Sequence, residues 1–163
     1  MATMKVEGLD HFAKQLNALD KDISKINRGA LGEGAKYAAN QIEKAIDSMP
    51  THSEGYSYAA PDTKRTGATA SEKSQIKANF GIARFKKTGS GWDTSIGFHG
   101  YVHTPSKRFN DNVPTGMLVQ CIDQGTDFRN GIHSISSASR SAKGGVESKI
   151  QDYIDKEVNK IMK

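Results

Sequence analysis

The chain has 163 residues, of which 36% are apolar and 25% charged, and its formal net charge is +5. This length predicts one domain over residues 1–163 and is too short for two. The single cysteine, Cys121, excludes an intrachain disulfide and a cysteine-rich zinc site. No apolar run approaches the length of a membrane span, so we expect neither a signal peptide nor a membrane partner.

The N-terminal third predicts two helices. From Leu9 to Met49, apolar residues recur at steps of three and four, which places them along one helical stripe. A stripe of this length usually breaks, and Asp20 or Asp22 in the segment LDKDIS is suited to cap a second helix. Pro50 then ends that helix.

Three glycines, Gly29, Gly32 and Gly34, fall within the second predicted helix, although each costs up to about 1 kcal/mol relative to alanine in a helix interior. A helix face made of such small residues predicts a close contact. The contact is either with a sheet of the same chain or with another subunit.

Two polar stretches, residues 50–73 and 99–116, predict long loops. The first shows no sustained period and is rich in Ser, Thr, Gly and Pro. Structureless segments of this length are uncommon in a compact domain unless they are functional. We therefore expect both stretches to be arms that become ordered on assembly.

The middle of the chain predicts strands. Apolar residues alternate over residues 76–82 and again over 92–98, on either side of the turn KKTGSG, which indicates a β-hairpin. The apolar run MLVQCID, residues 117–123, predicts a third strand. Val146, Ile150, Tyr153 and Ile154 begin one face of a C-terminal amphipathic helix.

These elements define the predicted fold. It is an α+β fold with two N-terminal helices, a small antiparallel three- to four-stranded sheet, a C-terminal amphipathic helix and long loops.

The positive charge is concentrated in residues 51–110, which hold nine Lys and Arg against four Asp and Glu, whereas the segments on either side are balanced. Such an excess favours an anionic surface nearby. DNA is one such surface, and the alternative is that lysines at a hairpin tip only keep the protein soluble. The residues that would face DNA are Arg84, Lys86, Lys87, Lys107 and Arg108.

The sequence offers no catalytic pattern. His99 and His103 have the spacing of a helical metal site, but the glycines and the proline around them argue against a helix. Glu72 and Lys73 are adjacent, whereas a metal-dependent nuclease needs an acid and a lysine on the same face of a strand. Serine-hydrolase and phosphate-loop signatures are missing too. We expect no enzyme activity, no metal and no cofactor.

The order of several segments resembles one known family. The opening VEGLDHFAKQLNALDKDISKINRGALGEGAKYAANQIEKAI, the loop element KRTGATASEKSQI, the segment LVQCIDQGT and the closing helix follow each other as in the tail-completion, or head-tail joining, family of long-tailed bacteriophages. The resemblance places Gly8 and Leu9 at the start of the first helix. One departure is the segment DFRNGIHSISSASRSAKGG, where family members often have a proline-rich, aromatic stretch.

The resemblance implies a structural virion protein of the neck or tail, made in the cytoplasm of a bacterial host. It would form a ring that completes the tail end and joins it to the head connector or adaptor, with the tail terminator or tail tube as the other partner. A hexamer is expected because tail tubes of this type consist of hexameric rings. Alternatives are another neck or minor tail protein and a small basic DNA-binding module.

The resemblance implies docking residues in two short motifs, the Arg-Thr-Gly at residues 65–67 and the Gly-Thr at residues 125–126. In the second motif, Gly125 is suited to a backbone conformation closed to other residues, so that the Gly-Thr forms a structural corner at the end of a strand. Asp127 and Arg129 would then be corner or interface groups. The candidate docking residues are Arg65, Thr66, Gly67, Gly125, Thr126, Asp127 and Arg129.

Overall fold

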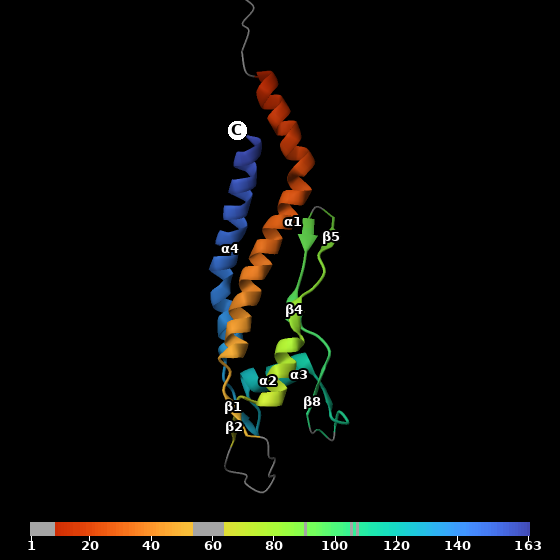
Figure 1. Cartoon of the computed structure of the whole chain (residues 1–163), viewed down its shortest axis with the longest axis vertical. Helices are drawn as coiled ribbons and strands as arrows, with labels where there is room; N and C mark the ends of the chain where they lie inside the picture. Colours follow the sequence, from red (N-terminus) through yellow and green to blue (C-terminus); the bar gives the residue numbers. More distant parts are fainter. Residues whose placement is uncertain (1–8, 54–63, 90, 105, 107) are drawn as a thin grey trace, which may run out of the picture.

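The computed structural model describes residues 9–53, 64–89, 91–104, 106 and 108–163. Two long helices, α1 (Leu9–Asp47) and α4 (Ser134–Ile161), lie side by side above a base of short strands and two short helices (Figure 1). The predicted α+β class and the C-terminal helix are confirmed. The molecule is a rod, because the two long helices extend away from the base in the same direction.

The seam between α1 and α4 depends on small residues. A Cβ atom at Gly34 would lie 2.9 Å from Ile150 Cγ1, and one at Gly29 would overlap the ring of Tyr153. These glycines therefore let the two helices approach closely within one chain. The contact was predicted to be either with a sheet of the same chain or with another subunit. Gly29 and Gly34 instead face α4 of the same chain, whereas Gly32 lies near Phe85 of the β-hairpin.

The predicted break near residue 20 is wrong, because α1 is one continuous helix of 39 residues. Asp20 and Asp22 are exposed on the helix surface and start no new helix. The stripe simply continues through Leu19 and Ile23 to the buried Ile26. The helix continues past both aspartates, because a residue suited to cap a helix does not by itself end one.

Two of the predicted strand segments are helical. Residues expected to open the hairpin belong to α2 (Ala70–Ala78), and the run MLVQCID belongs to α3 (Thr115–Gln124). In α2, a capping box between Thr69 and Glu72 fixes the helix start. In α3, Leu118, Val119 and Ile122 are all buried, and these positions lie on one face of a helix but would fall on both faces of a strand.

In the part of the chain that the structure describes, ten short strands form five two-stranded sheets instead of one sheet of three or four strands. Three pairs are antiparallel: β4 (Phe80–Ile82) with β7 (Ile96–Phe98), β5 (Lys86–Thr88) with β6 (Gly91–Asp93), and β8 (Tyr101–His103) with β9 (Asn112–Pro114). Two pairs are parallel: β1 (Thr51–His52) with β3 (Ala68–Thr69), and β2 (Arg65–Thr66) with β10 (Arg129–Asn130).

The two stretches predicted as loops contain several of these elements. Residues 50–73 include β1, β2, β3 and the first turn of α2, while residues 54–63 lie outside the described residues. Residues 99–116 include β8, β9 and the start of α3. Strands of two or three residues are too short to produce a period in the sequence, so both stretches looked structureless.

The predicted hairpin is present and packs along α1. The indole Nε1 of Trp92 donates a hydrogen bond of 3.2 Å to Ser24 Oγ. The guanidinium of Arg28 lies 5.2 Å from the centre of the Trp92 ring and 5.9 Å from that of Phe85. These cation–π contacts attach the hairpin to the middle of the long helix.

Side chains from the base form hydrogen bonds with backbone groups at the C-terminal end of α1 and the N-terminal end of α4. Lys73 Nζ donates to the carbonyl oxygens of Asp47 and Met49, at 2.7 and 2.8 Å, where α1 ends. The carboxylate of Asp123 accepts hydrogen bonds from the backbone N–H groups of Ile135 and Ser136, at 2.9 and 3.1 Å, where α4 begins. Each helix is thereby anchored to the base at its inner end.

A second link joins α2 to α1. Lys77 Nζ lies 2.7 Å from Asp47 Oδ1 and 3.7 Å from Glu43 Oε1. The hydrogen bond to Asp47, together with the charges of both carboxylates, raises the pKa of Lys77 above its ordinary value. All three side chains are about half exposed, so this cluster adds orientation and little stability.

We predict that Gly67→Ala destabilises the protein by at least about 2 kcal/mol. Gly67 is buried, its φ is +80°, and a Cβ atom there would overlap the carbonyl oxygen of Pro50. The matched control is Gly144→Ala in the interior of α4, where a Cβ atom meets open space. This control should stabilise by up to about 1 kcal/mol. Urea unfolding followed by circular dichroism measures both changes, and equal stabilities would contradict the prediction.

Candidate functional site

The two motifs that carry the predicted docking residues meet in the base. Strand β2 pairs in parallel with β10, so that Arg65 lies opposite Arg129 and Thr66 opposite Asn130. The Arg65 N–H also donates to the Phe128 carbonyl oxygen at 3.2 Å. Two segments more than sixty residues apart in the sequence thus form one surface.

Gly125 has the backbone conformation, unfavourable for other residues, that was predicted for the corner. Gly125 has a φ of +87°, and a Cβ atom there would lie 2.7 Å from the backbone nitrogen of Gly131. Thr126 and Arg129 exchange backbone hydrogen bonds of 2.8 and 3.2 Å, which closes the turn. The corner follows the helix α3 and not a strand, which corrects the predicted setting. Asp127 is exposed at the tip of this turn.

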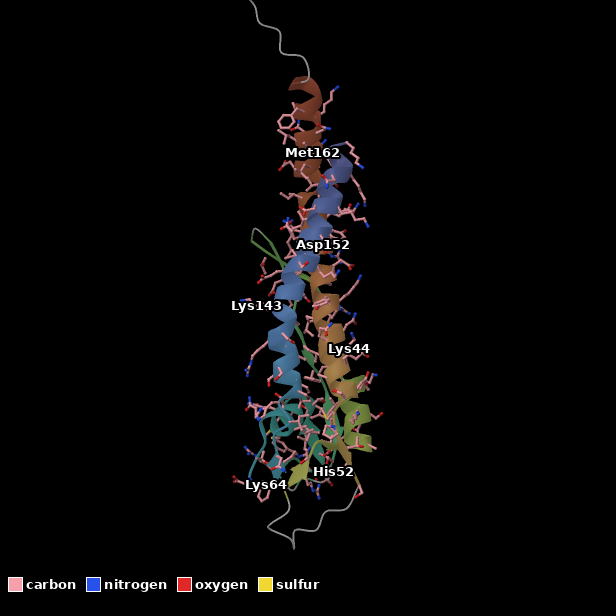
Figure 2. All side chains as sticks on the ribbon, turned by 90° about the vertical axis from the view of Figure 1, so that its left-hand side faces the viewer. Lys44, His52, Lys64, Lys143, Asp152 and Met162 are labelled. Atoms are coloured by element: carbon pink, nitrogen blue, oxygen red, sulfur yellow. The ribbon has the colours of Figure 1, made fainter. Side chains whose placement is uncertain are left out.

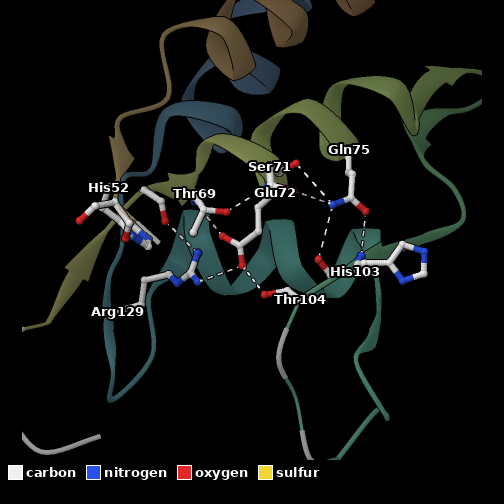
Figure 3. A network of polar contacts seen from close by, with 10 residues as sticks. His52, Thr69, Ser71, Glu72, Gln75, His103, Thr104 and Arg129 are labelled. Atoms are coloured by element: carbon white, nitrogen blue, oxygen red, sulfur yellow. Dashed lines mark hydrogen bonds and ion pairs between the residues drawn. The ribbon is translucent and has the colours of Figure 1, made fainter. Parts of the chain in front are cut away.

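A nearly buried ion pair lies beneath this surface (Figure 3). Arg129 Nη1 donates to the Gly67 carbonyl oxygen at 2.8 Å, and its Nη2 lies 3.7 Å from Glu72 Oε1. The side chains of Arg129 and Glu72 are 12% and 5% exposed, so water screens the pair weakly. The sequence indicated both motifs but not Glu72 as their common partner.

Hydrogen bonds satisfy both carboxylate oxygens of Glu72. Oε1 accepts from Thr104 Oγ1 at 2.8 Å, and Oε2 accepts from the Thr69 N–H at 2.9 Å. One carboxylate therefore serves the start of α2, the segment after β8 and the arginine of β10 together. This satisfies the requirement that a buried charge be both paired and hydrogen-bonded.

Gln75 of α2, drawn in Figure 3, and Asn79, which follows α2, cover one edge of β8. Gln75 Oε1 accepts from the His103 N–H at 2.8 Å, and Asn79 Nδ2 donates to the Tyr101 carbonyl oxygen at 3.0 Å. These side chains occupy backbone groups that an additional strand would use. The edge of β8 is thereby protected against strand addition.

A pocket of about 420 Å³ opens beside the ion pair. Its charged lining side chains are Arg65, Arg129 and Glu72. Most of the remaining wall is apolar or weakly polar, and two of its apolar side chains, Met117 and Phe128, are 38% and 68% exposed. The other lining residues are Thr69, Ser71, His103, Thr104, Ser106, Phe109, Val113, Leu118, Cys121 and Thr126.

The predicted DNA-facing residues do not form one patch. Arg84, Lys86 and Lys87 are exposed on the hairpin, beside the middle of α1. Arg108 is exposed in the base, where its guanidinium lies 5.3 Å from the centre of the Phe109 ring. Lys107 lies outside the described residues. In Figure 1, β5 and β8 are well separated along the rod, so Arg108 is not part of the hairpin surface.

Part of the apolar stripe of α1 forms a further exposed surface, which the sequence pattern did not reveal. Phe12, Leu16 and Ile23 belong to the apolar stripe of α1, yet they are 48%, 45% and 49% exposed. In Figures 1 and 2, α1 extends beyond Met162, which follows the end of α4, so the outer end of the stripe has no helix beside it. The stripe predicted a helix correctly, but the periodicity carried no information on the length of the helix that covers it.

Comparison with family models, with curated proteins and with solved structures finds no match for this chain. Within the described ranges, the His, Cys, Asp and Glu side chains form no group of three or more suited to hold a metal ion. In the same part of the chain, none of the helices combines the length and the apolar character that a membrane crossing requires.

We predict that Arg129→Gln lowers the free energy of unfolding by about 3 kcal/mol, because it leaves the carboxylate of Glu72 without its counter-charge. Adding Glu72→Gln should recover part of this loss, since glutamine keeps the capping box and removes the buried charge. Arg84→Gln, at an exposed position, is the control and should stay within about 0.5 kcal/mol of the unchanged protein. Denaturant unfolding of the four proteins tests this, and an Arg129→Gln protein as stable as the control would contradict it.

Proposed function

We propose that this protein is a structural subunit of the joint between the head and the tail of a long-tailed bacteriophage. It assembles into a ring, with sixfold symmetry as the working stoichiometry, between the head connector or adaptor and the tail terminator or tail tube. It acts in the virion by holding proteins together and not by catalysis. The order of the sequence motifs motivates this proposal, and the surfaces of the molecule support it.

The uncovered apolar stripe on α1 carries the proposal. Phe12, Leu16 and Ile23 follow one another at spacings of four and seven, so they lie on one face of the helix. Single exposed apolar residues are ordinary, whereas a stripe of this kind is what a helix buries against a partner. An isolated subunit leaves this stripe in water, which favours a protein that works in an assembly.

The position of the second surface agrees with a ring. The candidate docking residues of β2, β10 and the corner at Gly125 lie in the base, at the opposite end of the rod from the uncovered stripe. A closed head-to-tail ring requires two different patches on each subunit. The subunit presents two chemically distinct surfaces, one apolar and one bearing arginines, each available to a different neighbour.

The basic hairpin is the candidate for contact with DNA inside the ring. Arg84, Lys86 and Lys87 are exposed on it, while its aromatic residues Phe85 and Trp92 contact Arg28 of α1. The rings are therefore engaged by the protein itself, which favours contact with phosphates over stacking on bases. An independent DNA-binding module would instead bind duplex DNA as a monomer, with strong salt dependence.

The test of the joining role is electron microscopy of lysates of the phage that carries this gene with an early stop codon. We expect DNA-filled heads beside free tails. A plasmid copy of the gene should restore joined particles, whereas a copy with Leu16→Asp should not, because an aspartate cannot be buried against an apolar partner. The control copy carries Asn17→Asp, which adds the same charge at a neighbouring exposed position.

Two results would overturn the proposal. Infectious particles from the stop-codon phage would show that no joining function is missing. Joined particles with the Leu16→Asp copy would mean that the apolar stripe has no part in assembly. Circular dichroism should show that Leu16→Asp folds like the control, because the leucine side chain is already 45% exposed in the subunit.

Reversing the charge of the hairpin tests its proposed contact with DNA independently of ring formation. With Lys86→Glu and Lys87→Glu together, we expect joined particles in normal number but reduced delivery of DNA, because both side chains are exposed and lie outside the surfaces that we assign to assembly. The control reverses Lys143 and Lys149, which are exposed on α4. Counts of joined particles and of infected cells measure the two effects. Loss of the joined particles themselves would contradict the assignment of the hairpin to DNA.

A further inference from the structure

The antiparallel pair of β4 and β7, called the β4–β7 ribbon from here on, has outward-facing backbone groups along both edges. Hydrogen bonds of 2.8 and 2.9 Å continue its ladder beyond the two ends, joining Ala83 with Ser95 and His99 with Asn79. Hydrogen-bonded pairs alternate along an antiparallel ladder, so Gly81 and Gly97 form the pair between these two bonds. The backbone N–H and C=O groups of the other strand residues therefore point away from the ribbon: Phe80, Ile82, Ile96 and Phe98.

These two edges lack the protection that the other strand edges have. Within the described ranges, no hydrogen bond reaches the outward groups, and none of the four residues is buried. The edge of β8, in contrast, is occupied by Gln75 and Asn79, and β5 carries two lysines, which discourage strand addition. The segments FGI of β4 and IGF of β7 contain neither a charge nor a proline. Both edges of the ribbon are therefore suited to accept a further strand.

The shape of the ribbon also leaves room for a neighbour. The rings of Phe80 and Phe98 lie 5.2 Å apart and pack against the hydrophobic core, so one face of the ribbon belongs to the subunit itself. On the other face, a Cβ atom at Gly81 or Gly97 would meet nothing within 4 Å. Two strands of three residues are only marginally stable as a sheet, and an added strand on each edge strengthens them.

We propose that the β4 edge of one copy of this chain pairs with the β7 edge of a second copy. The strands are antiparallel within each chain, so copies that stand side by side in the same orientation bring β4 and β7 together as antiparallel neighbours. The two edges match in length, and each presents outward groups on two residues that lie two positions apart. A partner that supplies one strand would use one edge, whereas a second copy uses both.

This inference deepens the proposed function and rests on it only for closure into a ring. A contact between two different edges is heterologous, and its repetition either closes into a ring or continues as a filament. In Figure 1, β4 lies between the two ends of the rod. Pairing of ribbons therefore leaves the uncovered stripe of α1 at one end and the docking residues of the base at the other end available to the adjoining layers.

The test is amide hydrogen exchange of the full chain, measured residue by residue on the dilute monomer and at a concentration where sedimentation shows assembly. The N–H of His103 is bonded to Gln75 within the subunit, so its exchange rate is the reference and should stay the same. We expect at least about tenfold slower exchange in the assembly at the four outward amides of the ribbon, those of Phe80, Ile82, Ile96 and Phe98.

Three results would overturn the proposal. A chain that stays monomeric up to its highest soluble concentration forms no such contact. An assembly in which the four amides keep their monomer rates uses another surface, such as the uncovered stripe. Slower exchange on only one of the two strands would mean that each edge pairs with its own copy or with a single strand of another protein.

A proline variant tests the β4 edge directly. Ile82→Pro removes one outward N–H and leaves the pair between Gly81 and Gly97 in place. Ile82→Ala is the matched control, because it also loses the isoleucine side chain but keeps the N–H. We expect the proline variant to assemble about tenfold more weakly than the alanine variant in sedimentation, and equal assembly would contradict the proposal. Circular dichroism checks that both variants fold, and the exchange measurement on the unchanged protein depends on neither.

The particle experiments distinguish failure of this contact from failure of the proposed function. If the Ile82→Pro copy restores joined particles while the Leu16→Asp copy does not, the joining role stands and the pairing of ribbons is wrong. If the four amides are protected in the assembly while the stop-codon phage stays infectious, the contact between copies stands and the joining role is wrong.

Discussion

The ion pair between Arg129 and Glu72 is the contact on which the base depends. It joins two parts of the chain that are far apart in the sequence: the segment from Gly67 to the start of α2, and the strand β10. Strands of two or three residues bury too little to define a position by themselves. A fixed charge with several hydrogen bonds supplies the register that such short strands lack, at the cost of desolvating both groups.

Polar side chains also fix the long helices to the base. Lys73, from α2, binds the carbonyl groups at the end of α1, and Asp123, from α3, binds the N–H groups at the start of α4. Because α2 is itself fixed through Glu72, the orientation of α1 depends indirectly on the ion pair. The glycines of the seam then allow α4 to follow α1 at short distance. The rod is therefore defined by a few polar contacts at one end and by small residues along its length.

Periodicity predicted the elements that are long and amphipathic. The stripe from Leu9 to Met49 and the face that includes Ile150 and Tyr153 each cover several turns, so they identified α1 and α4. The short helices were mistaken for strands, because a short apolar run fits either period. Local signals for them were nevertheless present. Thr69 and Glu72 have the spacing of a capping box, and Pro114 and Gly125 enclose α3 as a proline and a glycine often enclose a helix.

The candidate site was predictable in its parts but not in its assembly. Arg65, Gly67, Gly125 and Arg129 were identified by motif, and the structure brings them together. Glu72 appeared in the sequence only as a poor fit to a nuclease pattern, since nothing local relates it to an arginine that lies 57 positions later. Tertiary pairing of charges follows from the chain path, which short motifs do not encode. For the same reason, the pocket and its apolar wall were not foreseen.

The single helix α1 connects the two proposed surfaces, and its length sets the distance between them. Its 39 residues correspond to about 58 Å of helix, with the uncovered stripe at one end and the base at the other. A helix held by a tight seam over most of this length transmits position with little bending. The exposed stripe and the candidate docking residues of the base are then set at a fixed separation within one subunit. The joint that we propose would need this property, because the spacing between the layers it connects must be the same in every subunit of the proposed ring.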